Sequence, residues 1–456
     1  LASATSMPLY GKLADLYGRK VVLQTSIGLF VGASLLCGMS ANMVQLILFR
    51  TLQGLGAGAI IPVATTIIGD LYTLEERGKM QGVLSAVWGV AGLIGPAVGA
   101  LIVERWHWGW VFFLNGPIGL VAIILLARFL REPLERRPRS IDWLGAAALA
   151  AGIALLLLAL LFGGVRFAWI SAPIILCALG GITALAAFLW HERRAVEPIL
   201  PLDLFRDPLI GTACAASFLT GIVLIAAMSY LPMFIQGVLG LPPRWSGIGA
   251  TLMSIAWPAC ATFGGTKMVS WGFRRLALIG GALQLVGALL LVSLAPGVGV
   301  WLPIAALVAM GGGFGFATGA YVVGVQTAVT WNRRGVATST VSFLRFLGQT
   351  LGIAVLGAVL NARIAVRLGQ SLGSRPLERV NELLDPSGRA ALAAGSVEPL
   401  QEALAVGLHG AFWIVCAVAL LTLILVARFF PARSEAEPSV HGAPAASPAP
   451  GSRGGG

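Results

Sequence analysis

The residues that could do chemistry in this chain are a few charged side chains set in or beside apolar segments. Arg50 lies inside the apolar run at 43–69, where a charge is expensive and usually faces a polar interior or a partner. The alternative for Arg50 is a structural role, in which it snorkels to the surface or forms a fixed ion pair. Asp15 and Arg19 lie in a short polar turn that joins two apolar runs.

Proton movement across a membrane requires a titratable group inside it. None of the 19 acidic residues lies in the middle of an apolar segment. Glu104 with His107 is the substitute candidate, although both also fit a solvated loop beside interfacial tryptophans. Enzyme chemistry is not indicated, because the sequence has no recognisable nucleophile–base pair, metal-ligand cluster or cofactor loop, and its five cysteines all fall in apolar runs.

The elements that must position these residues are membrane helices. Hydrophobic residues make up 57% of the 456 residues, charged residues make up 11%, and the mean hydropathy is +0.87. This composition predicts an all-α polytopic membrane protein. The net charge of +12 does not indicate nucleic-acid binding, because the bases lie in short loops between apolar segments.

Twelve apolar segments are long enough to span a bilayer. The residues before Gly11 are too few to span. We expect them to be the cytoplasmic half of a truncated helix, with one more helix missing upstream and fourteen in the intact protein. The predicted spans are 20–40, 43–69, 80–103, 109–130, 141–163, 168–190, 209–237, 246–270, 276–295, 300–329, 336–361 and 407–430.

Lysine and arginine set the predicted orientation. With the turn at 11–20 in the cytoplasm, 21 bases lie inside and eight outside, and Arg50 and Arg345 complete the total of 31. This bias predicts a multi-pass protein of a bacterial inner membrane with that turn on the cytoplasmic side.

The chain repeats itself. A turn that begins and ends with glycine occurs at 11–18 and at 265–272, and an Arg-Gly pair occurs at 77–78 and at 334–335. Two parallel halves of this kind are typical of transporters that rock two bundles around a central site. The predicted domains are an N-terminal bundle at 1–130, two inserted transmembrane helices with linkers at 131–208, a C-terminal bundle at 209–430 with a long outer loop at 362–406, and a disordered cytoplasmic tail at 431–456.

The segment at 80–103 carries glycines around one proline. The proline removes a backbone donor and favours a kink, and the glycines present a flat surface to a neighbouring helix. The corresponding position in the second half has no proline, so the kink is expected in one half only. The cluster consists of Gly92, Gly95, Pro96 and Gly99.

Taken in order, the glycine-bounded turn, the arginine helix, the Gly-Pro helix, the inserted helices and the long outer loop resemble the fourteen-helix drug:proton antiporter family of the major facilitator superfamily. The resemblance covers residues 1–430 and implies two six-helix bundles plus two inserted central helices. It implies that Arg50 takes part in proton transfer and that 92–99 is an antiporter motif, although Ala91 and Ala100 stand where that motif usually has glycine.

The resemblance also implies that the turn is a conformational latch. Asp15 would bind the start of the helix near Val336, whose free N–H groups attract an anion. Arg19 or Arg77 would orient or neutralise Asp15, while the alternative for the bases is a plain topology signal. The expected latch residues are Gly11, Asp15, Gly18, Arg19 and Lys20 in the turn and Arg77, Arg334, Gly335 and Arg345 around the partner helix starts.

A substrate site is expected near the membrane midplane between the halves. Few interior charges imply a hydrophobic or amphipathic substrate. Each candidate also fits ordinary packing; by depth they are Trp257, Tyr230, Tyr321, Gln326, Phe343 and Gln349.

The expected function is export of a lipophilic compound, expected to be a cation, in exchange for protons. The proton gradient supplies the energy, with no cofactor or metal. The expected partners are the substrate, protons and the lipid bilayer, with no nucleic acid and a monomeric state. The rivals are a dedicated metabolite or nutrient carrier of the same fold and a non-transporting membrane sensor or scaffold.

Overall fold

The computed structural model describes residues 2–130, 132, 142–163, 166–195, 197–368, 382–383 and 394–432. Within this part, eleven helices are long and apolar enough to cross a membrane, which confirms the predicted all-α membrane fold. The described residues contain no named strand, and their β-structure is one isolated bridge between Gly163 and Phe167. Apart from Pro431 and Ala432, the predicted tail lies outside the described residues.

Polar side chains mark where several helices begin. The side chain of Asn42 accepts from the backbone N–H of Gln45, and Thr73 with Glu76 forms a capping box. Asp207 accepts from the first N–H groups of the helix that follows it. Each cap pairs N–H groups that have no partner within the helix.

The N-terminal half is built from six helices, one of them very short. Its buried apolar core lies between the first three helices and the last one. The helices are α1 (Ala2–Tyr17), α2 (Arg19–Gly38), α3 (Met43–Leu71), α4 (Leu74–Arg105), α5 (Trp110–Phe113) and α6 (Asn115–Phe129).

The rest of the chain forms an inserted hairpin and the C-terminal half. The hairpin is α7 (Trp143–Phe162) and α8 (Ala172–Glu192). The C-terminal half has two large apolar cores. Its elements are η1 (Leu202–Arg206), α9 (Pro208–Met233), the π-helical turn η2 (Phe234–Val238), α10 (Pro243–Val292), α11 (Trp301–Ala328), η3 (Trp331–Arg333), α12 (Arg334–Leu368) and α15 (Ala394–Phe429).

Twelve predicted spans become eleven helices because the spans at 246–270 and 276–295 join in α10. They meet at Gly272, whose φ of 74° is not helical. Gly18, between α1 and α2, has a φ of 91°. Side chains other than glycine resist this region, so both turns need glycine for the same reason. The predicted repeat of the turn is therefore visible in the backbone.

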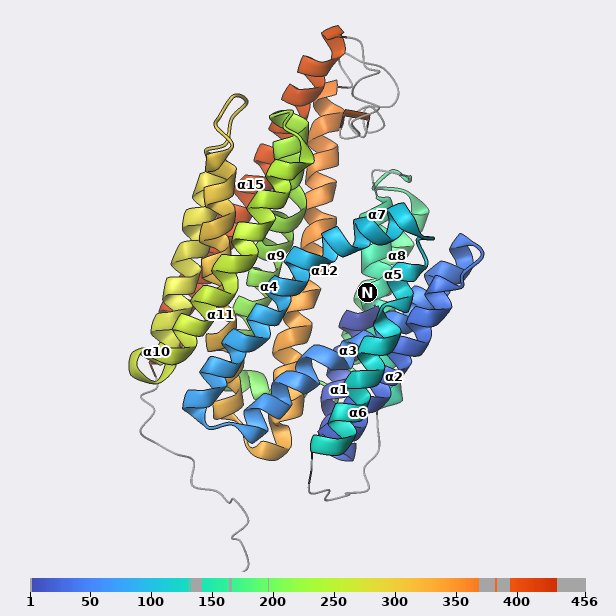
Figure 1. The fold of residues 1–456 in the computed structure, drawn as a ribbon, viewed down its shortest axis with the longest axis vertical. Coiled ribbons are helices and arrows are strands. Elements are labelled where there is room, and N and C mark those ends of the chain that lie inside the picture. Colours follow the sequence, from blue (N-terminus) through green and yellow to red (C-terminus); the bar gives the residue numbers. More distant parts are fainter. Residues whose placement is uncertain are drawn as a thin grey trace, which may run out of the picture.

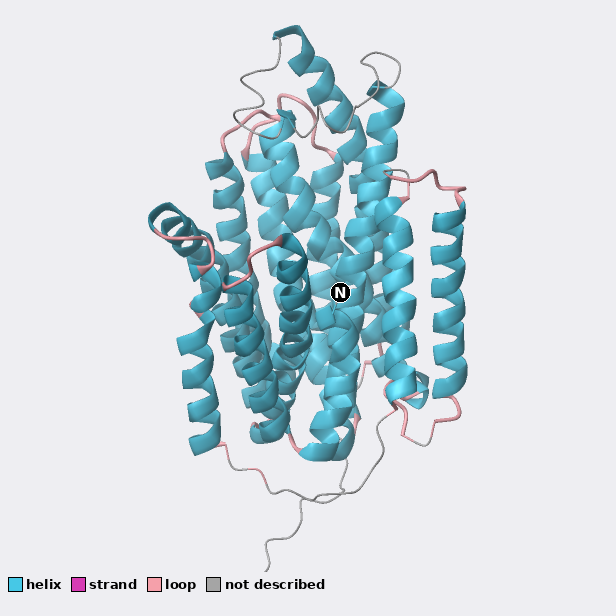
Figure 2. Cartoon of the chain, turned by 90° about the vertical axis from the view of Figure 1, so that its right-hand side faces the viewer, coloured by secondary structure: helices cyan, strands magenta, loops and turns pink. Residues whose placement is uncertain are grey.

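The two halves lie side by side, and one helix crosses between them. Figure 1 shows α9 to α12 and α15 on one side, α1, α2, α3 and α6 on the other, and α4 running between the groups. Figure 2 shows the same helices running roughly along one direction, as a membrane bundle requires. Although α4 belongs to the N-terminal half, it packs mainly on α10.

The inserted hairpin packs across the boundary between the halves. Its helix α7 contacts both α1 and α12. A buried cluster there joins Met7 of α1, Leu149 and Phe188 of the hairpin, and Phe343 of α12. The hairpin therefore touches both of the bundles that a rocking motion would move.

Candidate functional site

One end of the molecule holds a polar cluster that joins the two halves. Asp15, near the end of α1, accepts hydrogen bonds from the backbone N–H groups of Gly335 (3.1 Å) and Val336 (2.9 Å). These residues belong to the first turn of α12, where N–H groups lack helical partners and favour an anion. A carboxylate of the N-terminal half therefore caps a helix of the C-terminal half.

Arg19 forms the centre of this cluster. Its guanidinium lies 3.2 Å from Oδ1 of Asp15 and 3.2 Å from Oδ2 of Asp70. It also donates to the carbonyl of Trp331 at 3.0 Å and lies 3.9 Å from the centre of that ring. Its side chain is only 4% exposed, so its charge is balanced by the carboxylates around it. Glu132 adds a further carboxylate, which accepts from the backbone N–H of Arg19 at 3.0 Å.

Two further side chains of the C-terminal half reach the N-terminal half. Nη1 of Arg334 donates to the carbonyl of Gly69 at 3.1 Å and to Asp70 at 3.2 Å. Nε2 of Gln326, a buried residue of α11, donates to the carbonyl of Thr65 at 3.0 Å. The halves are thus held together at this end by direct bonds between α3 and both α11 and α12.

Glycines allow the helices at this end to cross at close range. A β-carbon on Gly11 would overlap the side chain of Ser339 and lie 2.8 Å from the carbonyl oxygen of Gly335. A β-carbon on Gly265 would overlap the backbone of Gly78, and the reverse also holds. Each glycine that begins a repeated turn therefore meets the glycine of the Arg-Gly pair in the opposite half.

Asp15 is the titratable group most affected by this packing. Burial raises its pKa to about 7, although the Arg19 guanidinium and the N–H groups of Val336 and Gly335 act to lower it. The nearby charge of Asp70 adds to the increase. The carboxyl group is therefore placed to change charge near neutral pH.

Two other bases of the predicted latch, Arg77 and Lys20, do not bond to Asp15 through their side chains. Arg77 donates to the carbonyl of Tyr72 at 2.9 Å, and the place expected for it beside the acids is taken by Arg334. Lys20 donates to two carbonyls at the end of α6, one of them that of Ala127 at 2.8 Å. The expectation that Arg77 orients Asp15 is therefore wrong in this structure, because the two residues form no direct contact.

Arg50 belongs to a separate polar network inside the N-terminal half. It donates to Oε1 of Gln53 at 2.6 Å, and Gln53 donates to the hydroxyl of Ser34 at 2.9 Å. That buried hydroxyl also accepts from Asn115 at 2.9 Å and donates to the carbonyl of Phe112 at 3.0 Å. Arg50 is an exposed residue at the end of this network, and it forms no ion pair with any residue that the structure describes. The Gln53 amide and the ring of Phe112, 5.7 Å from the guanidinium, are its neutral contacts.

The predicted Gly-Pro cluster lies in the middle of α4. Gly92 faces Ser254 of α10, but Gly95 and Gly99 have no neighbouring atom within 4 Å of where a β-carbon would lie. The expected flat surface is instead made by earlier glycines of α4, such as Gly89, which meets the carbonyl of Ser254. Pro96 lies within the continuous helix between these positions.

The six substrate candidates are not gathered in one site. Tyr230 donates its hydroxyl to the carbonyl of Ile353 at 3.0 Å, and Tyr321 is buried beside Phe430. Phe343 is buried under the hairpin. The others are Gln326 at the boundary between the halves, Trp257 with its ring 5.4 Å from that of Phe314, and Gln349 on α12 beside α9.

Arg345 is a second cation in the interior. It lies on α12 about two turns beyond Thr338, which accepts from Gln326 at the boundary between the halves. It forms no ion pair within the described part of the chain, and its nearest ring contact is Phe346, at 5.7 Å. Arg345 is half-buried, and a half-buried guanidinium without a carboxylate favours an anionic group beside it.

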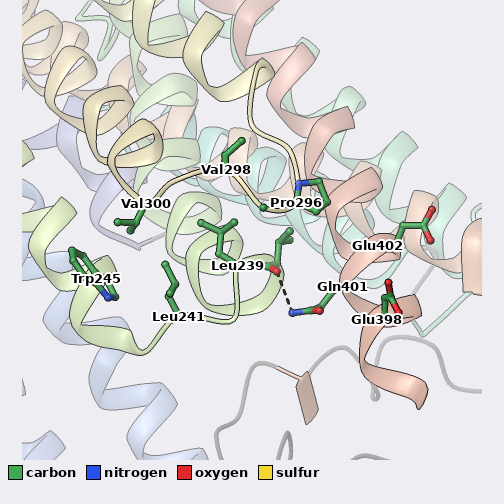
Figure 3. Close-up of a pocket in the computed structure, with 11 residues that line it drawn as sticks. Leu239, Leu241, Trp245, Pro296, Val298, Val300, Glu398, Gln401 and Glu402 are labelled. Atoms are coloured by element: carbon green, nitrogen blue, oxygen red, sulfur yellow. Dashed lines mark hydrogen bonds between the residues drawn. The ribbon is translucent and has the colours of Figure 1, made fainter. Parts of the chain in front are cut away.

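A cavity of about 580 Å³ lies near the end of the C-terminal half, next to the loop between α10 and α11. Figure 3 shows Trp245 and Leu241 on one side and Glu398 and Glu402 on the other. A second cavity of about 500 Å³ shares Pro296 and Glu402 with it. None of the predicted substrate residues lines either cavity.

Sequence reasoning missed several residues of these networks. Asp70 and Glu132 look like ordinary acids at helix ends, and Ser34 and Asn115 look like isolated polar residues. The signal that could have found Asp70 is its place at the end of an apolar run, shortly before the Arg-Gly pair at 77–78. Nothing local marks Ser34, because its partners come from three other segments.

Solved structures share this arrangement of helices. The human organic anion transporter MFSD10 has a TM-score of 0.62, with 16% identity over 93% of this chain and 81% of that one. The proton:xylose symporter XylE has a TM-score of 0.57, with 15% identity over 94% and 85%. At identities this low, the structural similarity is evidence for the fold alone, and it confirms the predicted fold.

Sequence comparisons define the family. The multidrug transporter protein MdtP of Bacillus subtilis is 37% identical over 363 residues, which cover 80% of this chain and 67% of that protein. Multidrug resistance protein 3 of the same organism is 38% identical over 360 residues, covering 79% and 70%. The family pattern described as Major Facilitator Superfamily matches residues 1–353. Because the chain matches this pattern and has two repeated halves joined at one end by paired turns, it belongs to the major facilitator superfamily and is a multi-pass membrane transporter related to multidrug efflux proteins.

Proposed function

We propose that the protein exports lipophilic compounds, with cations as the expected class, in exchange for protons. The observation that carries this proposal is the junction between Asp15 and the start of α12, supported by the glycine contacts around it. A junction that closes one end of two repeated bundles suits alternating access, in which breaking it opens that end. The relatives named multidrug transporters support a drug-like substrate.

The finer features of the proposal follow from the sequence. We infer that the closed end is the cytoplasmic end, because it carries the excess of bases, and that closure there belongs to the outward-open state of the cycle. We expect the protein to work as a monomer in a bacterial inner membrane without a cofactor. The proton gradient drives transport, and Arg50 takes part in proton transfer through its contact with Gln53.

The proposal is tested by efflux of a lipophilic cationic dye from a bacterium that lacks its own pumps. Dye efflux that depends on the protein and stops when a proton uncoupler is added supports antiport. Asp15→Asn and Arg50→Ala should each reduce it, while Asp203→Asn, an exposed acid paired with Arg333, should not. Uncoupler-resistant efflux would refute proton coupling, and no efflux from a well-inserted protein would refute drug export.

A second candidate is a carrier dedicated to an anionic metabolite, and Arg345 favours it. A half-buried guanidinium with no ion pair among the described residues would repel a cation and attract a carboxylate, a sulfonate or a phosphate group. A fluorescent amphipathic anion of similar size, used in the same cells, separates the two candidates. Export of the anion alone, lost in Arg345→Ala, would favour the second.

A further inference from the structure

The cytoplasmic end of the inserted hairpin contains two acids that neither the latch nor the Arg50 network uses. Asp142 precedes α7 and Glu192 ends α8. Asp142 is 9% exposed at its side chain, and Glu192 is 3% exposed as a residue. Two carboxyl groups this well buried are unusual unless each is paired or carries a proton.

Each acid has one satisfied and one unsatisfied oxygen. Oδ1 of Asp142 accepts from the backbone N–H of Gly145 at 2.9 Å, and Oε1 of Glu192 accepts from the backbone N–H of Leu200. Oδ2 of Asp142 and Oε2 of Glu192 are both buried and have no hydrogen-bond partner among the described residues. An unpaired ionised oxygen in such a place carries a large desolvation cost.

The two unsatisfied oxygens converge on the same small space. A β-carbon on Gly145 would overlap Oδ2 of Asp142 and lie 3.3 Å from Oε2 of Glu192. Both oxygens lie within 3.3 Å of that one point, so two charged carboxylates there repel each other, and one proton on the pair removes that repulsion. Gly145 leaves the room that this arrangement needs.

A third titratable group connects the pair to solvent. Nε2 of His191 lies 2.9 Å from Oδ1 of Asp142, and its side chain is 32% exposed. One ring nitrogen can take a proton from water while Nε2 passes one to Oδ1 of Asp142, so that one N–H bond breaks as one O–H bond forms. Rotation of the carboxylic acid group about its Cβ–Cγ bond then turns the O–H toward Glu192. The charges that directly follow Glu192 are Arg193 and Arg194, and the Arg194 guanidinium lies 4.1 Å from the centre of a Trp190 ring. Lys12 of α1 pairs with Glu197 in the segment that follows α8.

We propose that Asp142 and Glu192 form a proton-binding site that holds one proton between them and exchanges it with the cytoplasm through His191. The site lies in the hairpin that packs on both α1 and α12, and the segment from Glu192 to Leu200 also carries the Glu197 bond to α1. Proton binding here is therefore mechanically connected to the boundary between the halves. That connection rests on the proposed antiport, whereas the proton site does not.

Infrared spectroscopy of the purified protein in lipid vesicles tests the site directly. Spectra are recorded at a pH of about 7, and the spectrum of each variant, Glu192→Gln or Asp142→Asn, is subtracted from that of the wild type. We expect each difference spectrum to contain one band from a protonated carboxyl group. Both variants should lose it, because either substitution removes one of the two groups that share the proton. His191→Gln should keep the band, since the imidazole delivers the proton rather than holding it.

The variants are chosen to preserve the fold. Asparagine caps a helix as well as aspartate does, and glutamine keeps an acceptor for the N–H of Leu200. Asp203→Asn is the matched control and should leave the carboxyl region unchanged. If the band persists in either variant, the proposal is overturned. The measurement needs no substrate, so a failure of the drug-export proposal would leave this result standing.

Discussion

The carboxylate of Asp15 accepts the backbone N–H of Val336 at 2.9 Å, across the boundary between two halves of the chain that otherwise repeat each other. The repeat of Asp15 in the second turn is Val269, so the capping carboxylate exists on one side only. The glycine contacts, in contrast, exist on both sides. The glycine packing is therefore repeated in both halves, whereas the hydrogen bond from a helix start to a carboxylate occurs at Asp15 only.

Removing the Asp15 carboxylate should open the closed end. Asp15→Ala leaves the buried N–H groups of Gly335 and Val336 without their acceptor, while Arg19 keeps its bond to Asp70. A buried donor left unsatisfied costs about 1–3 kcal/mol. The five native cysteines are first replaced by serine, and one cysteine is then placed at Thr66, a buried residue that follows Thr65 at the boundary. Thiol labelling of that cysteine reports opening. We expect labelling to rise by about tenfold or more, because about 1.4 kcal/mol already gives a factor of ten.

Asp203→Ala is the control for that experiment, because Asp203 is an exposed acid whose bond to Arg333 lies outside the junction. Equal labelling in wild type and Asp15→Ala would show that the carboxylate does not hold this end closed.

Acidification should favour the closed end. The pKa of Asp15 is about 7 in this conformation, and an exposed aspartate has a pKa of about 3.9. Because the closed state binds the proton more tightly, it gains stability as the pH falls through 7, by about 1.4 kcal/mol between pH 8 and pH 6. Labelling at the Thr66→Cys position should therefore decrease as the pH is lowered from 8 to 6.

The same titration in an Asp15→Asn background separates this carboxyl from other titrating groups, because asparagine does not ionise there. A pH dependence of the same size in that variant would assign the effect to another residue.

Adding one methyl group at Gly265 should separate α4 from α10. A β-carbon there would overlap the backbone of Gly78, which cannot move aside as a side chain can. Overpacking of this kind costs about 1–3 kcal/mol. Thermal unfolding of the purified protein should show a lower midpoint for Gly265→Ala, with reduced transport.

Gly95→Ala is the matched control on α4, since nothing lies within 4 Å of the added carbon in this conformation. A loss of stability in Gly95→Ala as large as that in Gly265→Ala would contradict the packing described here.

Replacing Arg50 should separate dye binding from proton coupling. Arg50→Ala removes the donor to Gln53 and leaves that amide and Ser34 to re-pair with water. We expect the uncoupler-sensitive part of efflux to fall by at least about tenfold, as is common for a lost proton-transfer group, while dye binding to the purified protein changes little. Arg105→Ala, an exposed base at the end of α4, serves as the control. Loss of binding and efflux in parallel would indicate a structural role.

The sequence by itself determined the class of fold and marked the residues that need a turn or a partner. Hydropathy placed the spans, because each must bury about 20 apolar residues in lipid whatever its neighbours are. The glycines at 18 and 272 marked turns, because only glycine takes a positive φ without cost. The acid at position 15 stood out as a charge that must find a partner at the membrane surface.

Only the tertiary structure decided which partners meet. Arg334 rather than Arg77 pairs with Asp70, and the Gly95 region of α4 lacks the neighbour expected for it. The buried acids Asp142 and Glu192 look like solvated helix ends until the hairpin closes. Contacts between residues far apart in the chain depend on how whole helices cross, and a crossing angle is set by all the side chains along it rather than by any local motif.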